Sequence, residues 1–281
     1  MNEQVFRYGN TNQGFGISSL PEVMEGAPVL VLLNAGLLHR EEPYRLNVLV
    51  SRALASMGYI CIRVDLAGKG DTPESSEMTN RESVAQDWSN ISKAIEAQFG
   101  ERAVLILGLC SGADNAIKLT AEDSKIQGLL LLDPLANEDE YFKRRRLLIK
   151  LKDIHAWPRR LRKLLSIGIL RFKKKESGEA TISLRDPPTD EDIRMCFEAL
   201  VKRDGKVLAI FTSLALSYYN ESGQLVRSTN VKNLDSCCKE IFWPQMGHLY
   251  PVQHHREQLI GAISDWAAEN LNHFKAIKKI R

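Results

Sequence analysis

Short apolar runs alternate with longer amphipathic stretches along most of this chain. Continuous runs rich in Val, Leu and Ile predict strands that are buried on both faces of a sheet. Apolar residues at helical spacing, often ending at a Gly, predict helices between these strands. The predicted buried strands are residues 28–34, 59–66, 103–110, 128–133, 206–212 and 239–243. The predicted helices are residues 43–58, 81–100, 112–123 and 255–277.

Strands that alternate with helices at this spacing predict an α/β fold, with a doubly wound and mostly parallel sheet. Two runs at the start, Val5–Tyr8 and Phe15–Ser19, predict an additional hairpin. The alternation is interrupted between residues 136 and 203, where the sequence is basic and predicts helix or irregular structure. We therefore expect a core of residues 1–135 and 204–281 and a basic helical cap of residues 136–203, since insertions of this size commonly cover an active site.

Composition indicates a soluble globular protein. The 281 residues are 44% hydrophobic and 26% charged, and a chain of this length can bury a core without disulfides or metal ions. The five cysteines are odd in number and scattered, which is typical of reduced thiols and predicts a cytoplasmic location. The sequence shows no signal-peptide pattern, and no uncharged apolar run approaches the roughly 20 residues that a membrane span needs.

The stretch GLCSGADNA, residues 108–116, contains two adjacent nucleophiles directly after a predicted strand. A strand, a tight turn flanked by small residues and a helix together form the setting of a nucleophile elbow. The frame Gly-x-Nuc-x-Gly centres on Cys110, because centring it on Ser111 would place Leu109 where a small residue is needed. Cys110 is therefore the expected nucleophile, and the backbone N–H of Ser111 the expected oxyanion donor. The alternative is a buried thiol that only packs between strand and helix.

Three further motifs occur in a fixed order around this elbow: NAGL at 34–37, DLAGKGDT at 65–72 and PQMGH at 244–248. Together they resemble the α/β-hydrolase superfamily, and more narrowly its serine aminopeptidase-like or exosortase-associated subgroup. The resemblance implies that Gly36 or Leu37 supplies a second oxyanion N–H and that His248 is the catalytic base. The Cys at the centre of the elbow differs from the common Ser of the superfamily, and in this respect the sequence resembles dienelactone hydrolases.

The third member of the catalytic set is left open by the sequence. The superfamily usually carries an Asp shortly after the strand at 206–212, but residues 211–221 contain none. Asp133, at the end of the preceding strand, and Asn220 are the two candidates to orient the imidazole. A Cys nucleophile depends less on this residue than a Ser does, because a thiolate–imidazolium pair attacks without prior removal of a proton.

Basic residues concentrate between Lys143 and Lys175, with Asp153 as the single acid among them. One hypothesis is that this segment covers an acyl-binding cleft and attracts an anionic carrier, either an acyl carrier protein or a coenzyme A thioester. Docking on an acidic membrane surface and a merely solvated helix face are the alternatives. A nucleic-acid partner is not expected, because no nucleic-acid fold or aromatic platform accompanies the charge.

No cofactor and no metal site is expected. The fragment Gly68-Lys69-Gly70 is not a complete dinucleotide fingerprint, and His248, His254 and His255 lack a further zinc ligand. We therefore expect a hydrolase or acyltransfer enzyme of thioesterase or esterase type. It would cleave or transfer the acyl group of a small ester or thioester through an acyl-Cys110 intermediate. The alternative is a non-catalytic binding protein of the same fold.

Overall fold

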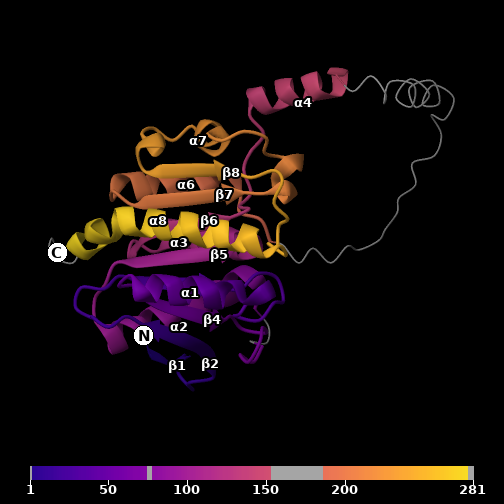
Figure 1. Ribbon diagram of the computed structural model, residues 1–281. Coiled ribbons are helices and arrows are strands. Elements are labelled where there is room, and N and C mark those ends of the chain that lie inside the picture. The colour runs from indigo at the N-terminus through magenta and orange to yellow at the C-terminus, as the bar shows by residue number, and fades with distance from the viewer. Residues whose placement is uncertain (1, 75–77, 153–185, 278–281) are drawn as a thin grey trace.

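The computed structural model describes residues 2–74, 78–152 and 186–277, except for the side chains of 149–152. These residues form one eight-stranded sheet in the order β1-β2-β4-β3-β5-β6-β7-β8 (Figure 1). Strands β1 and β2 form the predicted hairpin and β2 pairs antiparallel with β4, whereas all other pairs are parallel. The strands are β1 (Asn2–Tyr8), β2 (Gly14–Leu20), β3 (Val29–Leu33), β4 (Ile60–Asp65), β5 (Val104–Leu109), β6 (Ile126–Leu132), β7 (Lys206–Phe211) and β8 (Cys238–Phe242).

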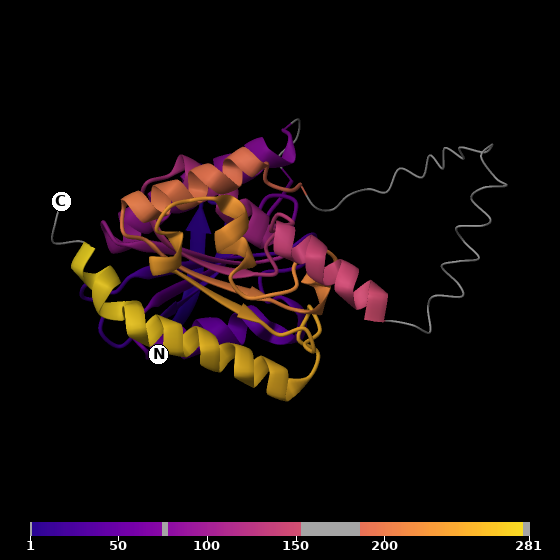
Figure 2. The same cartoon turned by 90° about the horizontal axis from the view of Figure 1, so that it is seen from above.

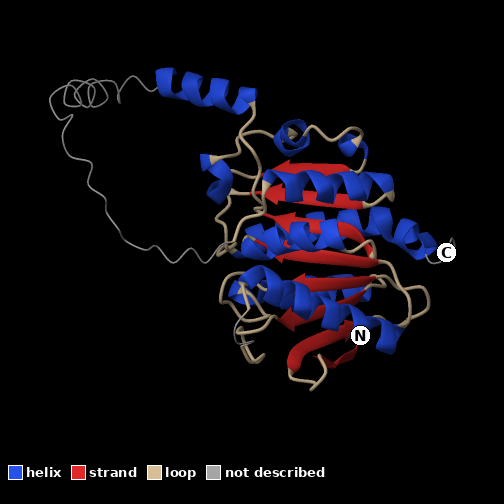
Figure 3. Ribbon diagram, turned by 180° about the vertical axis from the view of Figure 1, so that it is seen from behind, coloured by secondary structure: helices blue, strands red, loops and turns tan. Residues whose placement is uncertain are grey.

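Helices cover both faces of the sheet, as the alternating sequence pattern predicts (Figures 2 and 3). Two separate apolar clusters hold these layers together: one packs α1 and α8 against one face, and the other packs α2, α3 and α6 against the opposite face. The helices are α1 (Leu46–Ser56), α2 (Asn80–Phe99), α3 (Ser111–Glu122), α4 (Glu140–Lys152), α6 (Asp190–Lys202), α7 (Gln224–Thr229) and α8 (Gln253–Ile277). Short 3₁₀ turns lie at Pro43–Arg45, Ser213–Ser217 and Leu234–Ser236.

The predicted helix at 43–58 is divided in the structure. Its first residues form a 3₁₀ turn, and α1 begins only at Leu46. Glu42, Tyr44 and Arg45 all have φ between 56° and 59°, which is the left-handed region that non-glycine residues rarely adopt. The chain therefore makes a sharp bend before α1, and periodicity alone does not indicate it.

The predicted cap of residues 136–203 falls partly on 153–185, which lie outside the described residues. Its first helix, α4, extends away from the sheet (Figure 1). Its last helix, α6, packs on α3 and buries Ile193, Phe197 and Leu200 in the core. Residues 190–202 thus pack on the core, because their apolar positions recur at helical spacing on one face, and the cap at 136–203 stays a prediction. Within the described ranges, every helix is too short or too polar to span a membrane.

The carboxyl ends of the parallel strands meet at one edge of the sheet, where ligands commonly bind in open α/β sheets. All the parallel strands except β4 carry at this edge a residue considered below for the catalytic set. The loop after β3 carries Gly36, β5 is followed by Cys110, β6 by Asp133 and β7 by Thr212, and the loop after β8 carries His248.

Candidate active site

Cys110 occupies a strained turn between β5 and α3. Its φ of 53° and ψ of −116° lie outside the regions favoured by L-residues. The backbone N–H of Cys110 donates to the carbonyl of Leu132, with an N–O distance of 2.8 Å. A Cβ at Gly108 would lie only 2.2 Å from the backbone carbon of Gly112, so strand and helix approach too closely for any larger residue. This is the backbone geometry that a nucleophile elbow requires.

His248 is hydrogen-bonded to both Cys110 and Asp133. Its Nδ1 lies 2.6 Å from Oδ2 of Asp133, and its side chain also forms a hydrogen bond with Cys110. Burial acts to lower the pKa of His248, but the hydrogen bonds and charges of Asp133 and Cys110 outweigh it and raise the pKa to about 9. The imidazole is therefore held in its protonated form at neutral pH, between a thiol and a buried carboxylate.

Asp133 is fully buried and follows the last residue of β6. Besides His248, it accepts two hydrogen bonds from Thr212: one from the backbone N–H at 2.6 Å and one from the hydroxyl at 2.6 Å. Its own N–H donates to the carbonyl of Ile210. With three donors on its carboxylate, the side chain is fixed in the orientation that meets the imidazole.

The loop after β3 lies against the elbow. The N–H of Gly36 donates to the hydroxyl of Ser111 at 2.6 Å, so the structure brings two of the predicted oxyanion residues together. Ser111 is also the first residue of α3, where backbone N–H groups are free of intrahelical acceptors. Leu37, the third residue predicted for the oxyanion hole, is 70% exposed. Its side chain is therefore available to a ligand at the surface.

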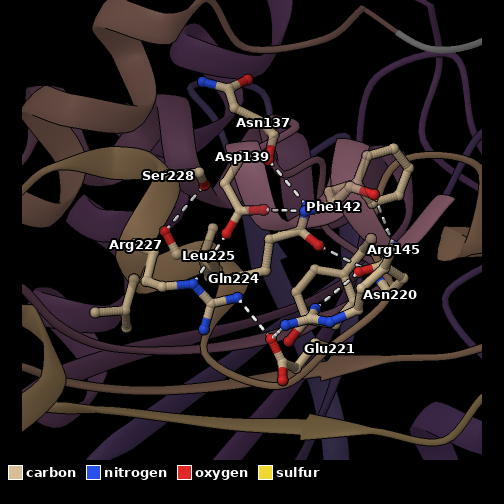
Figure 4. Close-up of polar contacts among 12 residues, drawn as sticks. Asn137, Asp139, Phe142, Arg145, Asn220, Glu221, Gln224, Leu225, Arg227 and Ser228 are labelled. Carbon is tan, nitrogen blue, oxygen red and sulfur yellow. Dashed lines mark hydrogen bonds and ion pairs between the residues drawn. The ribbon is translucent and has the colours of Figure 1, made fainter. Parts of the chain in front are cut away.

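Asn220 lies in a different network. Its side chain accepts from Arg145 and donates to the carbonyl of Phe142, both on α4 (Figure 4). Neighbouring Glu221 pairs with Arg145 and Arg227. The structure thus gives His248 the partner Asp133 and places Asn220 at the base of α4, where it fixes that helix rather than the imidazole.

Two residues near this cluster were not expected from the sequence. Thr212 takes the position directly after β7 and holds Asp133, as described above.

Glu42 is buried, and its Oε1 accepts the N–H of Ala35 at 2.6 Å, while its Oε2 has no hydrogen-bond partner among the described residues. Burial raises the pKa of Glu42 to about 7, against the opposing effects of the Ala35 hydrogen bond and of the charges on Lys69 and His248. No sequence motif marks Glu42, because it is singled out only by its hydrogen bond to Ala35, which forms within the folded loop after β3.

A second polar cluster lies beside the same loop. His39, Asp65 and Asp71 approach one another closely enough to bind a metal ion. The guanidinium of Arg40, however, already lies between them, with Nη1 at 2.5 Å from Asp65, 2.7 Å from Asp71 and 2.7 Å from His39. This cluster is an ion-pair network around Arg40, which fixes the loop after β3 to the turn after β4.

Comparison with known proteins identifies the fold. No protein-family model matches the chain, and no curated protein has a similar sequence. Among solved structures, XC6422 from Xanthomonas campestris, an α/β serine hydrolase without a lid, aligns with a TM-score of 0.56 at 14% identity, covering 96% of each chain. A dienelactone hydrolase from Anabaena variabilis gives a TM-score of 0.56 at 14% identity and covers 96% of this chain and all of its own. Est1E from Butyrivibrio proteoclasticus, solved with ferulic acid bound, gives 0.56 at 16% identity, with 93% and 98% covered.

These likenesses define the class of the fold. The chain has the α/β-hydrolase fold: a mostly parallel eight-stranded sheet flanked by helices, as the sequence predicts. At the edge where this fold presents its loops, Cys110, His248 and Asp133 form one continuous hydrogen-bonded set. The narrower resemblance to the serine aminopeptidase-like or exosortase-associated subgroup stays a prediction.

Proposed function

We propose that this protein is an acyl-transfer enzyme that cleaves the acyl group of a small ester or thioester through a covalent acyl-Cys110 intermediate. The observation that carries the proposal is the hydrogen-bonded series Cys110–His248–Asp133 at a strained elbow. A protonated His248 beside the thiol and the N-terminus of α3 behind it both favour the thiolate form of Cys110.

The reaction then follows from the positions of these groups. The Cys110 thiolate attacks the carbonyl carbon and forms a C–S bond, while the carbonyl electrons move to the oxygen. The backbone N–H of Ser111 and an N–H of Gly36 or Leu37 stabilise this oxyanion. Collapse breaks the bond to the leaving oxygen or sulfur, which takes the proton from His248. Neutral His248 next removes a proton from water, and the resulting hydroxide cleaves the acyl-Cys110 bond to release the acid.

The chemistry of the nucleophile favours thioester substrates. An acyl-Cys110 intermediate is itself a thioester, so exchange with a thioester donor is nearly balanced in energy, and transfer to an amine or alcohol is also open. The fold neighbours include a dienelactone hydrolase and an esterase, which supports reaction at an activated carbonyl. We further propose a coenzyme A or carrier-protein thioester as the donor and, from the free cysteines, a cytoplasmic location.

The carrier hypothesis depends on the basic residues of α4 and beyond. In the described part of α4, Arg144 pairs with Glu140, Arg145 with Glu221 and Arg146 with Glu138. These arginines are therefore partly neutralised. A carrier's phosphate would have to compete with the three carboxylates, and the preference for a carrier should weaken strongly as salt rises.

The test is formation of the intermediate. The protein is incubated with octanoyl-coenzyme A, octanoyl-N-acetylcysteamine and p-nitrophenyl octanoate, quenched in acid and weighed intact. We expect a mass increase of one acyl group that Cys110→Ala abolishes, and faster acylation by the coenzyme A ester than by the short thioester. Absence of both adduct and turnover on all three substrates would refute the proposal.

One observation favours the alternative of a non-catalytic binding protein. The N–H of Gly36 is already satisfied by the Ser111 hydroxyl, so a substrate carbonyl must displace that hydroxyl to reach it. Alkylation separates the two functions. A catalytic Cys110 should react with iodoacetamide in the folded state at pH 7 much faster than glutathione does, whereas a thiol that reacts no faster would indicate a binding protein.

A further inference from the structure

A cavity of about 350 Å³ lies beside the loop after β3, on the side of the sheet covered by α1. Its volume falls within the range of small-molecule sites. Charged residues dominate its wall, where four arginines face two glutamates. The lining consists of Glu3, Gln4, Val5, Ile17, Arg40, Glu41, Arg45, Val48, Arg52 and Arg63. None of these residues belongs to the proposed catalytic set.

Arg63 is the most unusual member of this wall. It projects from β4 and is only 4% exposed, although Arg is almost never fully buried unless it is paired. Its one ion pair is with Glu3, at 2.8 Å, and its buried Nε has no hydrogen-bond partner among the described residues. Burial lowers the pKa of Arg63, which shows that the charge is poorly solvated.

The carboxylates of the cavity do not balance its arginines. Glu3 accepts from both Arg52, at 2.7 Å, and Arg63, so one negative charge serves two guanidinium groups. Arg40 is engaged with Asp65 and Asp71 on its other side. Arg45 forms no ion pair within the described part of the chain. With Arg40 paired to these two aspartates, Arg45, Arg52 and Arg63 face Glu3 and Glu41, and the wall keeps an excess of one positive charge.

The N-terminus of α1 adds to this positive field. Arg45 is the residue that precedes the helix, it provides no side-chain cap, and the first turn contains no acidic residue. Val48, in that first turn, lines the cavity. The N–H groups of Leu46 and Asn47 already donate to the carbonyls of Pro43 and Glu41, so it is the helix dipole at this end that favours a bound anion.

We propose that this cavity binds a dianionic phosphate group, either a phosphate ester or a pyrophosphate, through Arg45, Arg52 and Arg63 beside the N-terminus of α1. Several guanidinium groups around one cavity match the geometry and charge of a phosphate better than those of a single carboxylate. Phosphate oxygens would accept hydrogen bonds from guanidinium N–H groups that Glu3 alone cannot pair. The site is independent of Cys110, so it stands whether or not the protein proves to be an enzyme.

The test is a calorimetric titration of the full chain with sodium pyrophosphate. A titration with sodium chloride at matched ionic strength is the blank. We expect saturable binding of one pyrophosphate per chain. Arg45→Asn and Arg52→Gln should each weaken binding about tenfold, the scale of one charge-assisted hydrogen bond. Asn is chosen at 45 because it tolerates the φ of 59° found there. Cys110→Ala should bind as well as the wild type.

Two variants separate a phosphate site from a purely structural ion network. Glu3→Gln frees both guanidinium groups and should strengthen pyrophosphate binding severalfold, whereas a structural network would only lose stability. Arg194→Gln is the control, because Arg194 is exposed on α6 and, among the residues that the structure describes, pairs only with Glu191 and Glu198; it should leave binding unchanged. Absence of saturable binding to the wild type, or equal weakening by Arg194→Gln, would overturn the proposal.

Discussion

Asp133 and His248 are 115 residues apart in sequence, yet Oδ2 of one lies 2.6 Å from Nδ1 of the other. Parallel topology makes this contact possible, because β6 and β8 flank β7 and all three end at the same edge of the sheet. Thr212, which follows β7 between them, holds the carboxylate with two hydrogen bonds. In the proposed mechanism the acid therefore acts from the end of β6, while Thr212 follows the strand after which the superfamily usually carries an Asp.

Asp133→Asn should lower both acylation and the pKa of His248. The amide removes the charge that stabilises the imidazolium, so the pKa of His248 falls from about 9 toward its ordinary value of 6.5. We expect acylation at pH 7 to slow by about 10²-fold or more, since the corresponding change costs about 10⁴ in a serine triad. The pKa is measured by NMR of the histidine ring. Asp265→Asn, an exposed residue on α8, is the control and should change neither quantity.

Thr212→Val should produce a smaller loss of the same kind. It removes the hydroxyl donor to Asp133 but keeps the backbone donor and nearly the same volume. Loss of one hydrogen bond to a charged group corresponds to about 1.5–3 kcal/mol, so we expect acylation to slow by roughly tenfold or more. Thr212→Ser keeps the hydroxyl and should restore most of the rate. If Val and Ser behave alike, the hydroxyl does not position Asp133.

Most of the sheet could be predicted from local sequence, because strands buried on both faces are mostly apolar. β3, β5, β6 and β7 appear as apolar runs at nearly their observed bounds, and β4 as an apolar run that also contains Arg63 and Asp65. The elbow was equally local, since Gly108 and Gly112 must both be small for strand and helix to approach. These features depend on contacts within a few residues of each other.

The remaining features depend on contacts between distant segments. Asp133 and Asn220 could not be separated, because the choice rests on which strand end faces His248. The burial of Glu42 could not be predicted from the sequence, since it depends on a hydrogen bond to Ala35 and on a positive φ at Glu42 itself. The packing of α6 could not be predicted for a similar reason: its apolar face is visible in the sequence, but its partner α3 is not.

Ser111→Ala decides which of the two adjacent nucleophiles reacts. The variant keeps the backbone N–H of Ser111 and removes only the hydroxyl that accepts from Gly36. We expect the acyl adduct to form still and to remain on Cys110, located by peptide mapping, with acylation changed by less than about tenfold, the scale of one hydrogen bond. An adduct lost in Ser111→Ala but kept in Cys110→Ala would reverse the assignment.

Glu42→Gln should change how stability depends on pH. The pKa of Glu42 is about 7 in the folded state against 4.5 ordinarily, so the folded state binds the proton more tightly than the unfolded state. Stability is therefore lost as pH rises from about 4.5 to 7, by on the order of 3 kcal/mol in total. Gln cannot ionise and should remove this loss. Urea unfolding at pH 5 and pH 8 measures it, and Glu257→Gln, exposed on α8, should keep the wild-type pH dependence.

Gly108→Ala and Gly261→Ala should have opposite effects on stability. At position 108 the new Cβ would lie 2.2 Å from the backbone of Gly112, where neither β5 nor α3 can move without disturbing the elbow. We expect a destabilisation above about 3 kcal/mol, or loss of folding. At position 261, inside α8, no atom lies within 4 Å of the added Cβ, and Ala should stabilise the helix by about 0.5–1 kcal/mol. Thermal unfolding of the two variants gives both signs. Equal stabilities would show that the close approach of strand and helix at the elbow is not what requires a glycine at 108.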